Sequence, residues 1–299
     1  MTCSGCTCRP PPSSPWSSTS RCPRPRTRSS TDAARAHHRR GRRHRQRHRR
    51  GVRRPGATLT LADRDLTALE STAARCDVPT AVRTADLADP EAPAVLVDRA
   101  WSAHGPVDIL VNAAGLYPSL DMADVDAASW DRLFAVNLRA PVLTTAAFAR
   151  HAMAEHRPGA VVNISSGSAQ RSRPGGGPYA SSKAALEMAT RAAALELGGH
   201  GIRVNAVSPG FVLVDSDCNP VSAEYARAIG VNPLGRPGAP QDIARAVCWI
   251  AGPEASWITG EVLRVDGGSS TGAHHLPRIW QTDDTRATAV GTTTEEHTR

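Results

Sequence analysis

From residue 57 onward, the sequence alternates between short apolar, β-prone segments and longer stretches rich in helix formers. Because strands that alternate with crossover helices pair in parallel, this order predicts an α/β fold: a doubly wound parallel sheet with helices on both faces. The domain is expected to span residues 57–268, followed by a polar, Thr-rich tail over 269–299. The expected strands are 57–62, 81–85, 107–111, 159–165, 202–207 and 262–265, and the expected helices are 65–76, 90–104, 127–157, a segment around Tyr179, and 240–250.

The first 56 residues have a different composition. They contain 16 arginines and one acid, Asp32, which gives this segment a net charge of +15 and leaves −7 for residues 57–299. They show neither helical nor strand periodicity, so we expect them to be disordered. The first strand and helix of the doubly wound sheet are therefore expected to be absent or aberrant. Three interpretations stay open: a nucleic-acid-binding arm, an organelle transit peptide, and translation in the wrong reading frame.

The reading-frame interpretation follows from the genetic code. If the arginine codons are CGN and residues 37–52 are read one base further on, the segment permits I-T-G-G-A-G-G-I-G-S-A-I-A-A-E-F. This sequence contains T-G-x-x-x-G-x-G, the type of glycine loop that holds a pyrophosphate at a helix N-terminus. Sequencing the DNA tests this hypothesis, and arginine codons outside CGN in this run would exclude it.

Tyr179 and Lys183 are the strongest candidates for chemistry. Lys183 is the only lysine in a chain that otherwise uses arginine, and it follows one of three tyrosines by four residues. On a helix, residues four apart share one face. A free tyrosine titrates near pH ~10, and a nearby cation favours the phenolate. The pair therefore suits proton exchange with an alcohol oxygen, while the simpler interpretation is a half-buried tyrosine and a solvated lysine on an amphipathic helix.

Asp63 ends the first expected strand. In a doubly wound sheet, a carboxylate that ends the second strand, about 20 residues after the glycine loop, accepts hydrogen bonds from an adenosine ribose diol. It repels a 2′-phosphate, which favours NAD over NADP. Arg64 beside it weighs the other way, because a guanidinium binds phosphate. The alternative interpretation of Asp63 is a helix N-cap.

Further residues stand at the ends of expected strands. Ser166 precedes Tyr179 by 13 residues, and Asn112-Ala-Ala-Gly115, Pro209-Gly210 and Asp266-Gly-Gly268 each close a strand. Together with Tyr179-x-x-x-Lys183, this combination resembles the classical short-chain dehydrogenase/reductase family over roughly residues 56–268. The resemblance implies a single Rossmann-like domain that interconverts a secondary alcohol and a ketone with NAD(P). It also implies a homotetramer or homodimer formed through two long helices.

The resemblance assigns roles to individual residues. Tyr179 is the expected acid and base, Lys183 lowers its pKa and binds the nicotinamide ribose, Ser166 binds the substrate oxygen, and Asn137 holds a water of the proton relay. Tyr117, Gln170 and Phe211 are candidates for the substrate pocket, and Val214 stands where the family often has a threonine. The expected cofactor-binding residues are Asp63, Asp86, Leu87, Asn112, Ala113, Ala114, Tyr179, Lys183, Pro209, Gly210 and Val212.

The printed sequence lacks the glycine loop, so we expect it to bind a dinucleotide poorly. The alternative function is a catalytically impaired scaffold of the same fold with an arginine-rich nucleic-acid-binding arm. No stretch approaches the roughly 18 apolar residues of a membrane span. The seven cysteines follow no apolar signal segment, which favours the cytoplasm, and Cys3-x-x-Cys6-x-Cys8 has no partner cluster, so no metal is expected.

Overall fold

The computed structural model describes residues 57–213, 222–273 and 276. Apart from Ala57, these residues belong to one compact unit, Thr58–Arg299. Residues 1–56, Val214 and most of the expected tail over 269–299 lie outside the described residues. The domain boundaries expected from composition therefore stay predictions.

All strand pairs within the described ranges are parallel. β1 (Leu59–Asp63) pairs with β2 (Thr80–Thr84). Because helices separate the strands in sequence, parallel pairing is the arrangement that the pattern predicts, and the doubly wound α/β class is confirmed. A second sheet has the order β3-β4-β5-β6, with the bounds Ile109–Asn112, Gly159–Ile164, Ile202–Pro209 and Val262–Val265.

The helices follow the predicted order, with two corrections. The expected helix 127–157 is divided by a π-helical turn, η1 (Ala135–Arg139), and ends at Ala154. A further short helix lies between the expected strand 202–207 and the expected helix 240–250, where no helix was expected, and the Ser222 side chain caps it by accepting from Tyr225 N at 3.1 Å. The helices are α2 (Leu66–Ala73), α3 (Ala92–His104), α4 (Ala127–Phe134), α5 (Ala140–Ala154), α6 (Gly177–Leu197), α7 (Ala223–Ile229) and α8 (Pro240–Ala251).

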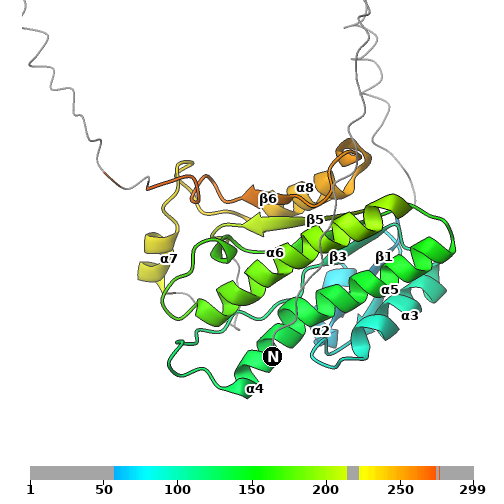
Figure 1. Ribbon diagram of the computed structural model, residues 1–299, viewed down its shortest axis with the longest axis horizontal. Coiled ribbons are helices and arrows are strands. Elements are labelled where there is room, and N and C mark those ends of the chain that lie inside the picture. Colours follow the sequence, from blue (N-terminus) through cyan, green and yellow to red (C-terminus); the bar gives the residue numbers. More distant parts are fainter. Residues whose placement is uncertain (1–56, 214–221, 274–275, 277–299) are drawn as a thin grey trace, which may run out of the picture. The chain divides into compact units, whose positions relative to one another are not determined.

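Helices cover both faces of the larger sheet, as Figure 1 shows for α5 and α6 in front of the strands and α8 behind them. Alternate residues of β4 pack into two different apolar clusters, because successive side chains of a strand point to opposite faces. Val161 joins Phe148 of α5 and Trp101 of α3 in one cluster. Val162 joins Ile250 of α8 in the other.

β1 and β3 lie at the edges of their sheets, and their apolar side chains are more exposed than those of the central strands β4 and β5. Within the described residues, β3 pairs only with β4, and β1 pairs only with β2. The apolar side chains of Ile109 and Val111 on β3 are 48% and 41% exposed, and Leu59 on β1 is 37% exposed. A strand covered by neighbours and helices would bury such residues. No described strand joins the two sheets.

Candidate active site

Tyr179 and Lys183 lie in the first two turns of α6, which begins at Gly177 with Pro178 in its first turn. As the spacing predicts, both side chains are on one face: the Lys183 Nζ lies 5.9 Å from the centroid of the Tyr179 ring. Lys183 is only 4% exposed, and its Nζ donates a 2.8 Å hydrogen bond to the carbonyl of Ile164 at the end of β4. The lysine is therefore a buried group of the site rather than a solvated surface residue.

Burial shifts the pKa values of both groups. It lowers the pKa of Lys183 to about 8, because the ammonium loses hydration. It raises the pKa of the Tyr179 phenol, and this effect is opposed by a hydrogen bond with the Ser166 side chain and by the positive charge of Arg173. At neutral pH the structure therefore holds a protonated phenol beside a cation that titrates close to physiological pH.

Ser166 is brought to Tyr179 by the loop that follows β4. Its Oγ accepts a 3.1 Å hydrogen bond from Ser168 N, which caps the short 3-10 turn η2 (Gly167–Ala169). The hydroxyl also forms the hydrogen bond with Tyr179 described above. A carbonyl oxygen bound between these two side chains would meet two hydroxyl donors.

Asn137 is fully buried in the π-helical turn η1. Its Oδ1 accepts from Leu116 N at 2.7 Å, and its Nδ2 donates to Leu116 O at 2.8 Å and to Ser182 Oγ at 3.0 Å. A Cβ on Gly115 would lie 3.5 Å from Asn137 Oδ1 and 3.6 Å from Lys183 Nζ, so both polar groups approach this glycine. The π-helical turn thus aims Asn137 between the β3–α4 loop and α6, as such turns often do at functional sites.

A buried polar network behind these residues was not found from the sequence. The Asn112 Nδ2 donates to Asn163 Oδ1 at 2.8 Å, and the Asn163 Nδ2 donates to Thr190 Oγ1 on α6 at 2.9 Å. Ser165 Oγ donates to the buried carboxylate of Glu187 at 2.8 Å. These bonds hold β3, β4 and α6 in one register, and the Asn112 side chain is already engaged within the protein. The sequence signal that could have revealed this network is the presence of polar residues, Asn112 and Asn163, in otherwise apolar strands.

Apart from Tyr179 and Lys183 on α6, the expected cofactor residues lie at or just after the carboxyl ends of strands. In a parallel sheet these ends meet at one edge, where open α/β sheets bind ligands. Gly210 packs so closely on the chain after β6 that a Cβ there would lie 2.7 Å from the Cα of Asp266. Asp63, Asn112 and Pro209 are the last residues of β1, β3 and β5, whereas the others follow a strand: Asp86 and Leu87 after β2, Ala113 and Ala114 after β3, and Gly210 and Val212 after β5.

The three candidates for the substrate pocket, Tyr117, Gln170 and Phe211, have different neighbours. The Tyr117 ring lies edge-on to the Tyr179 ring, with 6.4 Å between centroids, so Tyr117 adjoins the site. The Gln170 Oε1 instead accepts a 3.1 Å hydrogen bond from Arg264 on β6. Phe211 lies near Gly230, where a Cβ would be 3.7 Å from its ring, at the end of α7.

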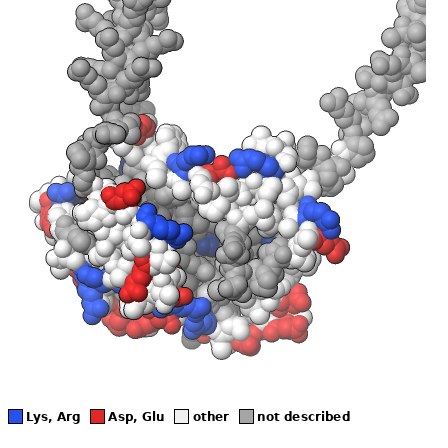
Figure 2. All heavy atoms as spheres, turned by 180° about the vertical axis from the view of Figure 1, so that it is seen from behind, with Lys and Arg blue, Asp and Glu red and all other residues white. Residues whose placement is uncertain are grey.

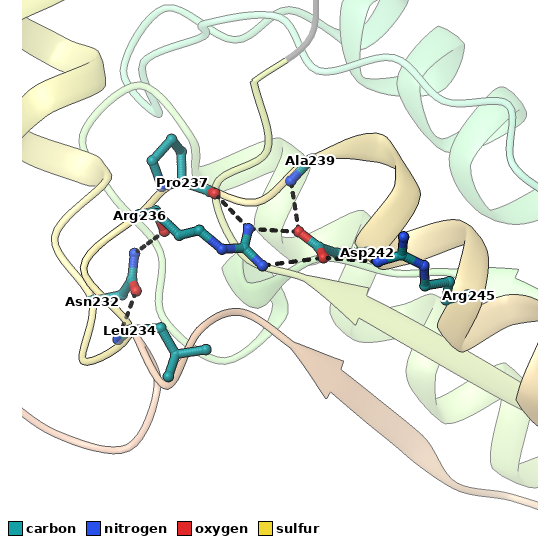
Figure 3. A network of polar contacts seen from close by, with 7 residues as sticks. All are labelled: Asn232, Leu234, Arg236, Pro237, Ala239, Asp242 and Arg245. Atoms are coloured by element: carbon teal, nitrogen blue, oxygen red, sulfur yellow. Dashed lines mark hydrogen bonds and ion pairs between the residues drawn. The ribbon is translucent and has the colours of Figure 1, made fainter.

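A second polar network fixes the chain between α7 and α8 (Figure 3). Arg236 binds both carboxylate oxygens of Asp242, at 2.7 and 3.2 Å, and Ala239 N donates to the same carboxylate at 3.0 Å. These hydrogen bonds lower the pKa of Asp242 to about 2. Asn232 Nδ2 donates to Arg236 O at 2.7 Å, and its Oδ1 would be 2.6 Å from a Cβ on Gly267. The network therefore positions the segment that follows α7 against the turn after β6.

Neither a metal site nor a membrane span is found in the part of the chain that the structure describes. No group of three or more histidine, cysteine, aspartate or glutamate side chains is arranged to hold a metal ion there. None of the helices formed by those residues is long and apolar enough to cross a membrane.

Comparisons with known proteins find relatives over most of the chain. The family model described as "Enoyl-(Acyl carrier protein) reductase" matches residues 50–270. A galactitol 2-dehydrogenase (L-tagatose-forming) of Cereibacter sphaeroides is 38% identical over 218 residues, which cover 71% of this chain and 85% of that protein. The L-xylulose reductase of Homo sapiens is 36% identical over 217 residues, covering 71% and 86%.

Solved structures give the same result. A short chain dehydrogenase/reductase family protein, 36% identical, superimposes with a TM-score of 0.62 over 73% of this chain and 88% of that one. A blue fluorescent protein from a metagenomic library, in complex with NADPH, is 32% identical, with a TM-score of 0.64 over 72% and 88%. Fold and site together define an NAD(P)-dependent oxidoreductase with a Rossmann-like sheet. The chain belongs to the short-chain dehydrogenase/reductase family, which confirms the resemblance found in the sequence.

Proposed function

We propose that this chain interconverts a secondary alcohol and a ketone, with Tyr179 as the group that exchanges a proton with the substrate oxygen. The observation that carries the proposal is the hydrogen bond between Tyr179 and Ser166 beside the buried Lys183. The nicotinamide cofactor supplies or accepts the hydride. The protein residues bind the oxygen and move the proton.

The proton steps follow from the geometry. In ketone reduction, the Tyr179 hydroxyl donates its proton to the substrate oxygen, while the Ser166 hydroxyl donates a hydrogen bond to the charge that builds there. The Lys183 ammonium, 5.9 Å from the ring centroid, favours the phenolate that remains. Asn137 lies next to this pair across Gly115 and is the proposed anchor of the water that passes protons to solvent.

The dinucleotide fits the site only in part. The strand ends offer Asp63 and Asp86 for the adenosine half and Pro209 and Gly210 for the nicotinamide half. The T-G-x-x-x-G-x-G loop that would hold the pyrophosphate does not occur in the printed sequence. We therefore propose that the printed chain binds NAD weakly and that residues 37–52 are read in a shifted frame. NAD is proposed over NADP because the Asp63 carboxylate would repel a 2′-phosphate.

A groove on the helical face favours self-association. It has a volume of about 580 Å³ and lies among Phe134, Leu138 and Val142 of the α4–α5 run and Ala185 and Ala189 of α6. Val142, which lines the groove, is exposed, and the small residues Ala185 and Ala189 on α6 permit close helix packing. We propose a homotetramer, with a dimer as the alternative, in the cytoplasm. Analytical ultracentrifugation distinguishes these states from a monomer.

A nucleic-acid-binding arm is the second candidate, because residues 1–56 carry a net charge of +15. On the face seen in Figure 2, basic and acidic side chains of the described residues are interspersed rather than gathered by sign. This face therefore offers no gathered basic patch, and we propose that any nucleic-acid binding depends on the arm. A salt-dependent shift of random DNA that disappears when residues 1–56 are removed would support this function.

A screen of secondary alcohols and ketones tests the main proposal. It compares the printed chain with a loop-repaired variant, in which residues 37–52 carry the shifted-frame sequence. With the loop-repaired variant, the absorbance of the nicotinamide should change on addition of at least one substrate. With the protein that has the printed sequence, it should change weakly or not at all. Binding of NADH by the repaired variant without turnover of any alcohol or ketone would contradict the proposal.

A further inference from the structure

The loop between η2 and α6 holds a cation at one defined place. The guanidinium carbon of Arg173 lies 5.2 Å from the centroid of the Tyr225 ring on α7. The stem of the same side chain lies over Gly176, where a Cβ would be 3.0 Å from Arg173 Cγ, and Gly176 N donates to Arg173 O at 2.9 Å. Gly176 directly precedes α6. Arg173 is therefore held between its own turn and an aromatic ring, an arrangement that guanidinium groups favour.

This cation adjoins the catalytic phenol. Its positive charge is near enough to lower the pKa of Tyr179 against the effect of burial. The turn that carries it is tied to the loop after β3, because Leu120 N donates to Gly175 O at 2.8 Å. That loop also carries Tyr117, whose ring lies edge-on to Tyr179. The Arg173 guanidinium and the Tyr117 ring thus adjoin the phenol, and the Tyr225 ring carries the guanidinium.

The charge of Arg173 is available to a ligand. Arg157 and Arg236 form ion pairs with Asp108 and Asp242, whereas Arg173 forms none within the described ranges and is exposed. A guanidinium stacked on a ring keeps its N–H donors at its edge, where they match the oxygens of a carboxylate, sulfonate or phosphate. A neutral polyol offers this group no charge.

We propose that Arg173 binds an anionic group at the far end of the substrate, so that the enzyme acts on small hydroxy or keto compounds carrying a carboxylate, sulfonate or phosphate. This inference rests on the proposed function, because the carbinol or carbonyl end is placed at Tyr179 and Ser166. It makes Arg173 a residue that determines substrate specificity. It also separates this chain from relatives named for galactitol and xylulose.

The test compares two ketones of nearly equal shape, 4-oxopentanoate and its neutral amide, 4-oxopentanamide. Their dissociation constants are measured by NMR titration of the protein as expressed, without cofactor. We expect the carboxylate to bind about tenfold more tightly than the amide, because a charge-assisted pair at a partly exposed site contributes modestly. Arg173→Gln should remove this difference and leave the affinity for the amide unchanged.

Two variants make the result specific. Arg173→Lys keeps the charge and should retain part of the preference, whereas Arg171→Gln, with the same loss of charge two residues away, should leave the preference intact. Equal binding of both ketones, or no binding of either, overturns the inference. So does an Arg173→Gln variant that weakens both equally, since Arg173 would then only hold α7. None of these results touches the proposed reaction, because turnover of neutral alcohols by the loop-repaired variant and its dependence on Tyr179 are measured separately.

Discussion

Two regions of the fold differ in how well their strands are covered: β4 and β5, called here the complete half, and β1 to β3, called here the incomplete half. In the larger sheet, β4 and β5 bury Val161, Val162, Val204 and Val207 completely, with helices on both faces. At the other end, β1 and β3 have free edges among the described residues and leave apolar side chains exposed. The proposed acid and base, Tyr179, and its neighbours Ser166 and Lys183 lie beside the complete half, whereas the pyrophosphate loop would belong to the incomplete half. We therefore expect repair of the loop to change cofactor affinity more than it changes the proton-transfer groups.

Restoring the glycine loop should have the largest effect. In the loop-repaired variant, the backbone amides of the loop would bind the pyrophosphate, and two charge-assisted hydrogen bonds of about 2 kcal/mol each correspond to roughly a thousandfold in affinity. Titration with NADH, followed by nicotinamide fluorescence, measures this gain. Tight binding by the printed chain would show that the incomplete half does not limit cofactor binding.

The buried Lys183 should make stability depend on pH. Its pKa of about 8 in the folded protein lies below the unfolded value, so the unfolded chain binds more protons between these two values. The free energy of unfolding should then rise as the pH increases from about 8 toward 10.5, by up to roughly 3 kcal/mol for this group. Urea unfolding at several pH values, compared with Lys183→Met, isolates this contribution. Parallel pH profiles of the two proteins would mean that Lys183 is hydrated.

Two valines at paired positions allow the contribution of each half to the unfolding free energy to be compared directly. Val111 on β3 and Val162 on β4 are register partners, yet Val111 is 41% exposed and Val162 is fully buried. Val162→Ala should cost about 2 kcal/mol of unfolding free energy, and Val111→Ala less than about 1 kcal/mol. Urea denaturation measures both. Equal costs in the printed chain would mean that β3 is covered, and a larger Val111→Ala cost in the loop-repaired variant would mean that repair covers it.

Coenzyme preference should show the smallest effect. In the loop-repaired variant, Asp63→Ala is expected to reduce the preference for NAD over NADP by about tenfold, because it removes the carboxylate that repels a 2′-phosphate. The ratio of kcat/KM values for the two coenzymes reports this change. An unchanged ratio would assign Asp63 to a structural role, consistent with the hydrogen bond that its Oδ1 accepts from Asp65 N at 3.1 Å.

Much of the fold and part of the candidate site could be predicted from local sequence patterns. Short apolar segments and stretches of helix formers predicted the six described strands and most of the helices, but neither α7 nor the π-helical turn η1. The i, i+4 spacing predicted that Tyr179 and Lys183 share a face. The buried partners could not be predicted in this way. Asn163 and Thr190 meet only because α6 crosses β4, and Arg173 meets Tyr225 only because a loop folds onto a helix 50 residues further along the chain. Such contacts depend on tertiary packing, which single-residue propensities do not contain.

The most direct test of the account is turnover by the loop-repaired variant with and without the Tyr179 hydroxyl. Tyr179→Phe should lower kcat/KM by roughly 10²–10⁴-fold, because proton transfer to the substrate oxygen is lost. Ser181→Ala, on the same helix with its hydroxyl bonded to Gly177 O, serves as the control. Retention of full turnover by Tyr179→Phe would contradict the assignment of Tyr179 as the acid and base.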